Sequence, residues 1–483
     1  MRGWWCVVGL VVACGSRKEP RDLEVSTGAP RASPLGKKQL AAPDPASAIG
    51  TAHPFLAIVV AENGRWIVGC QAREETDGRP GISVDVGHHG QLSGDRMRPF
   101  LFRGGGAGDP IDAFVTASVD ERWIAVVRDR RFVLIDDAEH VEIEVPDVDV
   151  EPDREGYGRI ATFDGRDRYL AFFRVVAGKR RVVVRELATG SEREVTFAGD
   201  VLPWRFQRER DSHWVRVLVV SEDSDGNGKL EWPSVGTNAP VAAVCAGEFV
   251  SYSEFGRRGD VPQAMWIDLA SGRVVQGTNV LAHIGDAEVR ARDGAVYIGD
   301  DEVVPAKCKA AVVAVILDPR RVVARCDDAE VLTLFGGSAP VELDGASAPR
   351  GELPEPRVMR ARVLCSNPET CFAAADGKRL KLHGSMVDQA GTKLLLKRGE
   401  GFVMFDAGTG AEKAVPGATG YVRARAKDLR VVDNVVIDLA NARVVGKLAH
   451  PPLGIDARGR GLLAEREAAQ GVATGPVRWV APE

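Results

Sequence analysis

The sequence has few of the features that mark a membrane-spanning or nucleic-acid-binding protein. Beyond the N-terminal segment, its longest uninterrupted apolar run, Ala310 to Leu317, has eight residues, which suits a buried strand but is too short to cross a bilayer. The formal net charge is −5, from 63 Lys and Arg against 68 Asp and Glu. A nucleic-acid surface usually needs a strongly basic patch, so the sequence predicts a protein with no nucleic-acid partner.

Common catalytic and metal-binding motifs are also missing. The eight His residues form no HExxH pair, no GxSxG nucleophile elbow is present, and no cysteines are spaced as CxxC. The glycine-rich segment 103–109 lacks the Lys-Ser/Thr ending of a phosphate-binding loop. These absences leave no residue that the sequence alone would name as catalytic or as binding an organic cofactor.

The chain begins with a segment that has the features of an export signal. Arg2 precedes an apolar run from Trp4 to Ala13, which is too short to span a bilayer but suits the apolar region of a secretory signal. Residues 11–14, Val-Val-Ala-Cys, resemble the lipobox of bacterial lipoproteins. The resemblance implies that residues 1–13 are a removed signal peptide and that the thiol of Cys14 is acylated. An ordinary signal peptide without acylation is the alternative.

The residues after Cys14 bear on location and on the form of the next segment. Gly15 and Ser16 are not acidic, and the lipoprotein resemblance links an acidic residue there to inner-membrane retention. It therefore implies a cell-envelope protein in the outer membrane of a Gram-negative host. Residues 14–54 are rich in Pro, Ala, Ser, Gly and Lys. Such a segment cannot bury enough apolar surface to offset the entropy of ordering, so we predict a lipidated, disordered tether.

A repeated pattern of short strands and tight turns fills residues 55–483. In its clearest copy, residues 159–197, apolar positions alternate as in half-buried strands. Turns are expected at Asp164-Gly165, Ala177-Gly178 and Thr189-Gly190, because glycine tolerates positive φ. One such meander of about forty residues would leave an apolar face open, so the copies must stack against one another.

This repeat predicts an all-β fold for residues 55–483. Units of about forty to sixty residues give a β-propeller of about seven or eight four-stranded blades. The phrase Asp-Gly-Arg-(Trp/Tyr)-(Ile/Leu)-Ala, followed by Leu-Ala-Thr-Gly, resembles the blades of TolB-like propellers. The resemblance implies a fold and not an activity. A smaller propeller followed by a C-terminal β domain is the alternative, because the periodicity weakens between residues 280 and 385.

Six cysteines follow the N-terminal segment, and an even number in an exported protein suggests disulfides. Cys308 and Cys326 flank two apolar runs that can form a hairpin, which would place the two thiols opposite each other. Cys365 and Cys371 can close a small loop. Buried free thiols are the alternative for each pair. A third pair follows only by elimination: Cys70 and Cys245.

Residues 223–231, Asp-Ser-Asp-Gly-Asn-Gly-Lys-Leu-Glu, match the first half of a calcium-binding loop. Oxygen atoms converge on a hard cation at this spacing, and the glycine before the lysine permits the sharp turn. The predicted metal ligands are Asp223, Asp225, Asn227, the carbonyl of Lys229 and Glu231.

The match to a calcium loop ends after its first half. Ser234 occupies the position of the bidentate glutamate of an EF-hand, so Glu231 would substitute for it, directly or through water. No flanking helices are evident, and the segment resembles calcium loops inserted in propeller strands. A structural Ca²⁺ is the predicted cofactor, and a solvated acidic turn is the alternative.

Propeller faces are broad and carry loops from every blade, which suits recognition. The sequence therefore favours a non-catalytic, lipid-anchored envelope protein that binds a protein or another envelope component. A calcium-dependent propeller hydrolase or lyase is one alternative, and a purely structural envelope lipoprotein is the other. A His–Asp pair or two carboxylates from different blades, meeting at the channel mouth beside the metal loop, would favour the enzyme.

Overall fold

The computed structural model describes an all-β protein in the following parts of the chain: residues 31–32, 36–42, 55–73, 82–85, 91–104, 108–150, 160–176, 179–197, 201–209, 211–221, 263–276, 280–285, 287–316, 318–326, 331–347, 357–359, 362–466 and 472–483. One short 3-10 helix, η2 (Ala306–Cys308), interrupts the strands. In these residues no helix is long and apolar enough to cross a membrane.

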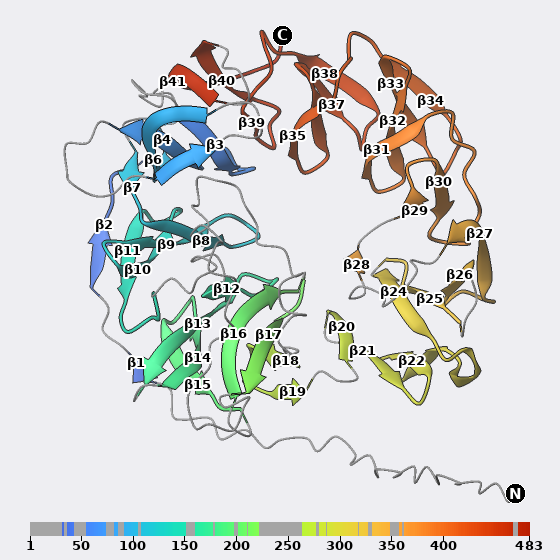
Figure 1. Ribbon diagram of the computed structural model, residues 1–483, viewed down its shortest axis with the longest axis horizontal. Helices are drawn as coiled ribbons and strands as arrows, with labels where there is room; N and C mark the ends of the chain where they lie inside the picture. The colour runs from blue at the N-terminus through green and yellow to red at the C-terminus, as the bar shows by residue number, and fades with distance from the viewer. Residues whose placement is uncertain are drawn as a thin grey trace, which may run out of the picture.

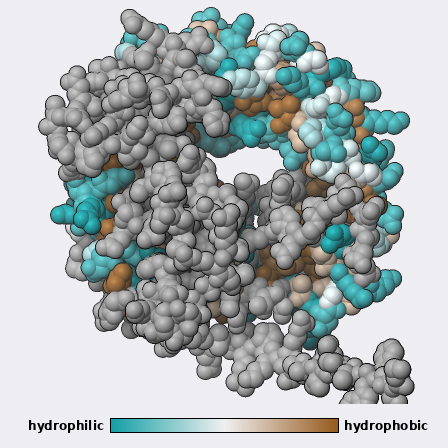
Figure 2. All heavy atoms as spheres, in the orientation of Figure 1, coloured by the Kyte–Doolittle hydropathy of each residue, from teal (hydrophilic) through white to brown (hydrophobic). Residues whose placement is uncertain are grey.

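Nine sheets follow one another around a ring (Figure 1), and an opening is visible at the centre of the ring (Figure 2). The predicted all-β propeller is therefore confirmed, and the expected seven or eight blades are close to the nine sheets observed. The sheets after residue 300 continue the same ring and form no separate C-terminal domain (Figure 1). The smallest sheet has two strands and falls where the periodicity of the sequence weakens.

Three sheets form the first part of the ring (Figure 1), and the first strand of each four-stranded meander is an edge strand of its sheet. Their strands are β8 (Ala113–Ala117), β9 (Trp123–Arg128), β10 (Arg131–Asp136) and β11 (Val141–Val145); β12 (Ala161–Phe163), β13 (Tyr169–Val176), β14 (Lys179–Glu186) and β15 (Ser191–Val195); and β16 (Val201–Arg208), β17 (Trp214–Ser221), β18 (Gln263–Asp268) and β19 (Val274–Gln276).

Three further sheets continue the ring. Their strands are β20 (Val280–Ile284), β21 (Ala287–Arg292), β22 (Ala295–Ile298) and β23 (Asp301–Val304); β24 (Ala311–Ile316), β25 (Arg321–Arg325), β26 (Val331–Phe335) and β27 (Val341–Ser347), with β28 (Arg357–Met359) added beside β24; and the two-stranded sheet of β29 (Val363–Asn367) and β30 (Thr370–Ala373).

The last sheets bring the chain back to its start. Two are four-stranded: β31 (Ser385–Ala390), β32 (Lys393–Arg398), β33 (Gly401–Asp406) and β34 (Glu412–Val415); then β35 (Val422–Ala426), β36 (Leu429–Val432), β37 (Val435–Asp438) and β38 (Arg443–Lys447). The closing sheet joins β39 (Gly454–Ile455), β40 (Gly461–Arg466) and β41 (Val472–Val480) to β3 (Phe55–Val60), β4 (Trp66–Arg73), β5 (Ile82–Asp85), β6 (Gln91–Arg103) and β7 (Asp109–Pro110).

Two contacts between distant parts of the chain close the ring. β41 pairs antiparallel with β3, so that Phe55 lies opposite Ala473. The last residue, Glu483, exchanges two main-chain hydrogen bonds of 3.0 Å with Lys447 at the outer edge of β38. The C-terminus is thereby held against two sheets.

The clearest sequence repeat forms the meander β12 to β15. β13 and β14 pair over their whole length, from Tyr169 opposite Glu186 to Val176 opposite Lys179. Gly190 has a φ of 72° in the hairpin that follows, a conformation that glycine adopts without strain. The predicted turns at Asp164-Gly165 and Thr189-Gly190 are confirmed, and the one at Ala177-Gly178 lies outside the described residues.

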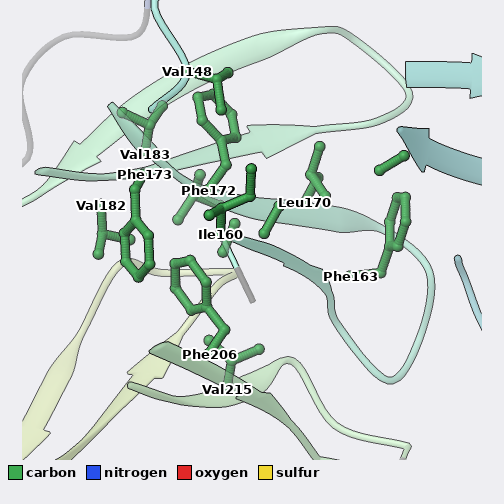
Figure 3. Close-up of a cluster of buried hydrophobic side chains, with 14 of the residues drawn as sticks. Val148, Ile160, Phe163, Leu170, Phe172, Phe173, Val182, Val183, Phe206 and Val215 are labelled. Atoms are coloured by element: carbon green, nitrogen blue, oxygen red, sulfur yellow. The ribbon is translucent and has the colours of Figure 1, made fainter. Parts of the chain in front are cut away.

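Apolar side chains from successive sheets pack into shared clusters. The largest cluster extends from β8 to β19, and Figure 3 shows its centre. Phe173 is fully buried there, and its ring stacks on that of Phe206 from the next sheet with centroids 4.2 Å apart. This stacking between neighbouring sheets is the packing that an isolated meander lacks.

Two short strands lie inside the segment that the composition predicts to be a disordered tether. β1 (Arg31–Ala32) pairs with β15, and β2 (Lys37–Gln39) pairs with β11, each as a fifth strand at an outer edge. The structure differs from the prediction at these residues. The composition of a segment indicates how much apolar side-chain surface it can bury. Pairing with an open sheet edge needs only main-chain hydrogen bonds.

The structure contains two of the predicted disulfides. Cys308 is bonded to Cys326 across the hairpin of β24 and β25, and Cys365 is bonded to Cys371 across β29 and β30. The Cα atoms of the two pairs are 4.6 Å and 4.0 Å apart, respectively. Of the third predicted pair, Cys245 lies outside the described residues.

Candidate functional site

The residues predicted to bind calcium, Asp223, Asp225, Asn227, Lys229 and Glu231, lie outside the described residues, and so does the acylation site Cys14. The described chain fixes only where the calcium segment is attached. In sequence it lies between Ser221, the last residue of β17, and Gln263, the first residue of β18. Elsewhere in the described chain, no three His, Cys, Asp or Glu side chains are grouped to hold a metal.

A His–Asp pair joins two neighbouring sheets. His213 Nδ1 lies 2.6 Å from Asp164 Oδ2, and the Asp164 side chain is fully buried. His213 immediately precedes β17, whereas residues 223–231 follow that strand in sequence and lie outside the described residues.

The hydrogen bonds around the His213–Asp164 pair indicate that it stabilises a turn. Asp164 Oδ1 accepts hydrogen bonds from the main-chain N–H groups of Arg168 and Tyr169 at 2.7 and 2.9 Å. The hydroxyl of Ser212 donates to the carbonyl of Gly285 on the next sheet. These groups hold turns and link sheets, so their hydrogen-bonding capacity is used by the scaffold.

Carboxylates perform the same task between other sheets. Glu121 accepts hydrogen bonds from the main-chain N–H groups of Glu62 and Asn63, both at 2.7 Å. Burial raises the pKa of Glu121 above its ordinary value, and these main-chain donors oppose the shift. A second carboxylate, Asp167, accepts from the turn of Val119 and Asp120 in the same way. Acidic residues in these turns therefore join each sheet to its neighbour.

The innermost strand β35 presents a different kind of surface. Along it, exposed residues alternate with partly or fully buried ones. Its exposed face, together with the residue before the strand, consists of Tyr421, Arg423 and Arg425, and we call these three residues the β35 rim. Because side chains two apart share one face of a strand, an aromatic ring and two guanidinium groups belong to one exposed face of β35, and this strand lies next to the central opening (Figure 1).

Asp388 on the neighbouring innermost strand β31 holds the end of the β35 rim. Its Oδ2 lies 2.7 Å from Arg425 Nε and 2.8 Å from Arg430 Nε. Arg430 is buried and also donates to the carbonyls of Lys427 and Gln389. Arg425 is 61% exposed, and its two terminal nitrogens have no hydrogen-bond partner among the described residues. Asp388 thus orients a guanidinium whose other donors face solvent.

Arg423 is held by an aromatic ring. Its guanidinium carbon lies 3.8 Å from the ring centroid of Tyr421, which is 56% exposed. Asp433 lies 3.8 Å from Arg423 Nε, beyond a direct hydrogen bond, and accepts one from the hydroxyl of Thr419. The cation–π contact and this carboxylate limit the conformations of Arg423. The arrangement can bind an anion without first ordering two long side chains.

Sequence reasoning did not identify the β35 rim. The signal is present in residues 421–425, Tyr-Val-Arg-Ala-Arg, where large polar or aromatic residues alternate with small apolar ones. It becomes informative only when β35 is known to be the innermost strand of its sheet, since the same alternation on an outer strand would face bulk solvent.

Comparisons with known proteins reach only the fold. No family model and no curated protein matches the sequence. Among solved structures, dipeptidyl peptidase 4 from Porphyromonas gingivalis is similar with 9% identity and a TM-score of 0.32, over 81% of this chain and 52% of that one. The chain therefore spans about half the length of the peptidase.

Two further solved structures are similar at comparable levels. TolB from Acinetobacter baumannii has 10% identity and a TM-score of 0.23, over 75% of this chain and 66% of that one. An oligogalacturonate lyase from Vibrio parahaemolyticus has 10% identity and a TM-score of 0.27, over 90% and 98%. TolB is thus among the structural neighbours, as the sequence resemblance implied. The likeness is too low to transfer an activity, since peptidases, a lyase and TolB stand side by side.

Proposed function

We propose that this chain is a non-catalytic binding protein of the cell envelope and is anchored through an acylated Cys14. Its β35 rim binds a protein or another envelope component. The β35 rim carries the proposal, because it combines an exposed aromatic ring with two oriented cations beside the opening of the ring. Tyr and Arg are the residue types that contribute most to binding interfaces.

The use of the other polar groups supports binding rather than catalysis. The His213–Asp164 pair, Glu121 and Asp167 all hold turns or join sheets. A general acid or base needs a free position for substrate within hydrogen-bond reach, and the carboxylates of Asp164, Glu121 and Asp167 already accept hydrogen bonds from the main chain. We assign to Ca²⁺, bound by residues 223–231, the structural role of ordering the excursion between β17 and β18.

A photo-crosslinking amino acid at position 421 tests the proposed function in intact envelopes. We expect discrete adducts of constant mass, together with recovery of the protein in the membrane fraction. Position 444 on the outer strand β38 is the matched control, since Val444 is 36% exposed and lies away from the opening. Adducts at both positions alike, or at neither, would contradict binding at the β35 rim.

The anchor is tested separately by Cys14→Ser. We expect the variant to move from the membrane fraction to the soluble fraction while its thermal midpoint stays unchanged, since residue 14 lies well before the first described strand. The same fractionation for both proteins would exclude acylation at Cys14 as the means of attachment.

A further inference from the structure

The ring already contains one strand that is added at an inner edge. β28 pairs parallel with β24, the first strand of its four-stranded meander, and places Arg357 opposite Ala314 and Met359 opposite Ile316. An extended segment can therefore lie on the inner side of a sheet in this ring. Main-chain hydrogen bonds supply the affinity in such strand addition, and neighbouring side chains supply the specificity.

The inner edge of β35 has no such added strand among the described residues. β35 is the terminal strand of its sheet, and its only strand partner is β36. Its main-chain groups on the side of the opening are therefore available to an extended chain. The other face of β35 is fixed, because Val422, Ala424 and Ala426 pack against apolar clusters.

The side chains of the β35 rim define the charge of a partner at this edge. Three arginines, at positions 423, 425 and 430, are set against two carboxylates, Asp388 and Asp433. Asp388 is shared between two of the arginines, which leaves a local excess of positive charge on a chain whose net charge is −5. An anionic partner would therefore match this edge.

The spacing of the two exposed arginines defines the partner further. Residues two apart on a regular strand are about 6.5 Å apart, and a paired strand places its own side chains about 5 Å from theirs. Arg423 lies at a register shift between Val422 and Ala424 in the ladder with β36, and Arg423 and Arg425 are both exposed, with the partly buried Ala424 between them. A segment with acidic residues at alternate positions would therefore place one carboxylate against Arg423 and the next against Arg425. Arg–carboxylate pairs of this kind are charge-assisted and directional.

We infer that the inner edge of β35 binds an acidic extended segment of a partner protein by strand addition, with alternate carboxylates on Arg423 and Arg425. This inference rests on the proposed function and specifies its ligand. Tyr421 extends the same face by one position and offers its ring to the residue that follows the acidic pair.

Binding of a fluorescent peptide tests this assignment. The probe is Thr-Glu-Thr-Glu-Thr-Glu, and the comparison peptide has Gln at each Glu. We expect saturable binding of the acidic peptide only, weakened at least tenfold by Arg423→Ala with Arg425→Ala, since each contact is worth about a factor of ten or more. Arg425→Lys keeps the charge but loses the planar fork, and it should weaken binding severalfold.

The matched control removes two exposed arginines elsewhere. Arg130→Ala with Arg292→Ala changes the net charge equally at two exposed residues of other sheets, one in the turn before β10 and one at the end of β21, and should leave binding unchanged. Unaltered thermal midpoints would show that both double variants fold. An equal loss in the control, or no saturable binding up to about 1 mM peptide, would overturn the inference. If position 421 still forms its adduct in the Arg423→Ala, Arg425→Ala protein, the proposed function stands with a different ligand.

Discussion

Two arcs of the ring are held together in different ways. In the first arc, residues 113–276, one apolar cluster runs through three successive sheets. The ladders of the β12–β15 meander are uninterrupted, and each of the other two sheets has a register shift in one ladder. In the second arc, residues 280–382, the apolar clusters are separate and smaller, and a register shift interrupts a ladder in every sheet.

Both described disulfides lie in the second arc. A cross-link lowers the entropy of the unfolded chain and thereby stabilises a region whose packing contributes less. The comparison indicates that one architecture is maintained by continuous packing in one arc and by covalent links in the other.

The largest expected effect is the loss of packing in the first arc. Phe173→Ala removes a fully buried ring that stacks on Phe206 and lies 4.9 Å below the guanidinium of Arg180. We expect a loss of about 4 kcal/mol in the free energy of unfolding, measured by denaturant titration. Val176→Ala, at a residue 40% exposed, should cost less than about 0.5 kcal/mol. Similar costs for both would refute a continuous core.

The next effect separates the two arcs. Replacing Cys308 and Cys326 by serine opens a loop with a sequence separation of 18 and should cost about 3 kcal/mol. The same change at Cys365 and Cys371, with a separation of 6, should cost about 2 kcal/mol. Hydrogen exchange should rise within residues 280–382 and stay unchanged in residues 113–197. Uniform exchange throughout the ring would show that the arcs are equally dependent on the cross-links.

Adding Ca²⁺ tests whether metal binding stabilises the first arc in addition to its apolar packing. With Ca²⁺ at a hundred times its dissociation constant, we expect stabilisation of about 2.7 kcal/mol and a higher thermal midpoint. Asp223→Ala with Asp225→Ala should abolish this shift, and Mg²⁺ in place of Ca²⁺ should give a smaller one, since it demands stricter geometry. An unchanged midpoint with no heat of binding in calorimetry would rule out the site.

The smallest effect is a contrast in pH dependence. Burial raises the pKa of Glu209, in the first arc, to about 7, so its contribution to stability is greatest below its ordinary pKa and is lost as the pH rises through 7. We expect Glu209→Gln to be stabilised relative to the wild type by about 2 kcal/mol more at pH 8 than at pH 5. Equal differences at both values would mean that Glu209 is not the titrating group.

The contribution of His283, in the second arc, to stability changes with pH in the opposite direction. Burial between Trp214 and Trp266 lowers its pKa to about 3, so its contribution is present above its ordinary pKa and is lost as the pH falls below 6.5. His283→Gln should therefore reduce the loss of stability between pH 7 and pH 5. A wild-type-like pH profile for this variant would assign the acid sensitivity to other groups.

The sequence was sufficient to predict the repeat but not to predict the β35 rim. Alternating apolar residues and the glycine turns of residues 159–197 predict a meander because strand period and turn conformation are local properties. The pairing of Cys308 with Cys326 follows from the hairpin between them. The predicted seven or eight blades are close to the nine sheets, of which the two-stranded sheet of β29 and β30 is the smallest.

The parts that could not be predicted depend on contacts between distant residues. Asp388 and Arg425 lie on different sheets, and their pairing is set by the curvature of the ring. The strands β1 and β2 contain Lys and Arg and no large apolar residue, so only the presence of an open edge on β11 and β15 explains their conformation.

The pairing of β1 and β2 with outer strands shortens the segment between the proposed anchor, Cys14, and the ring. From Cys14 to Phe55 the chain has 41 residues, which at about 3.5 Å each could reach roughly 140 Å. With Arg31 fixed on β15, only 17 residues separate the proposed anchor from the ring, and the reach falls to roughly 60 Å. With the proposed anchor at Cys14, the ring is attached through the outer strands β11 and β15. A force applied at the anchor must separate β1 from β15 before it acts on the closing sheet.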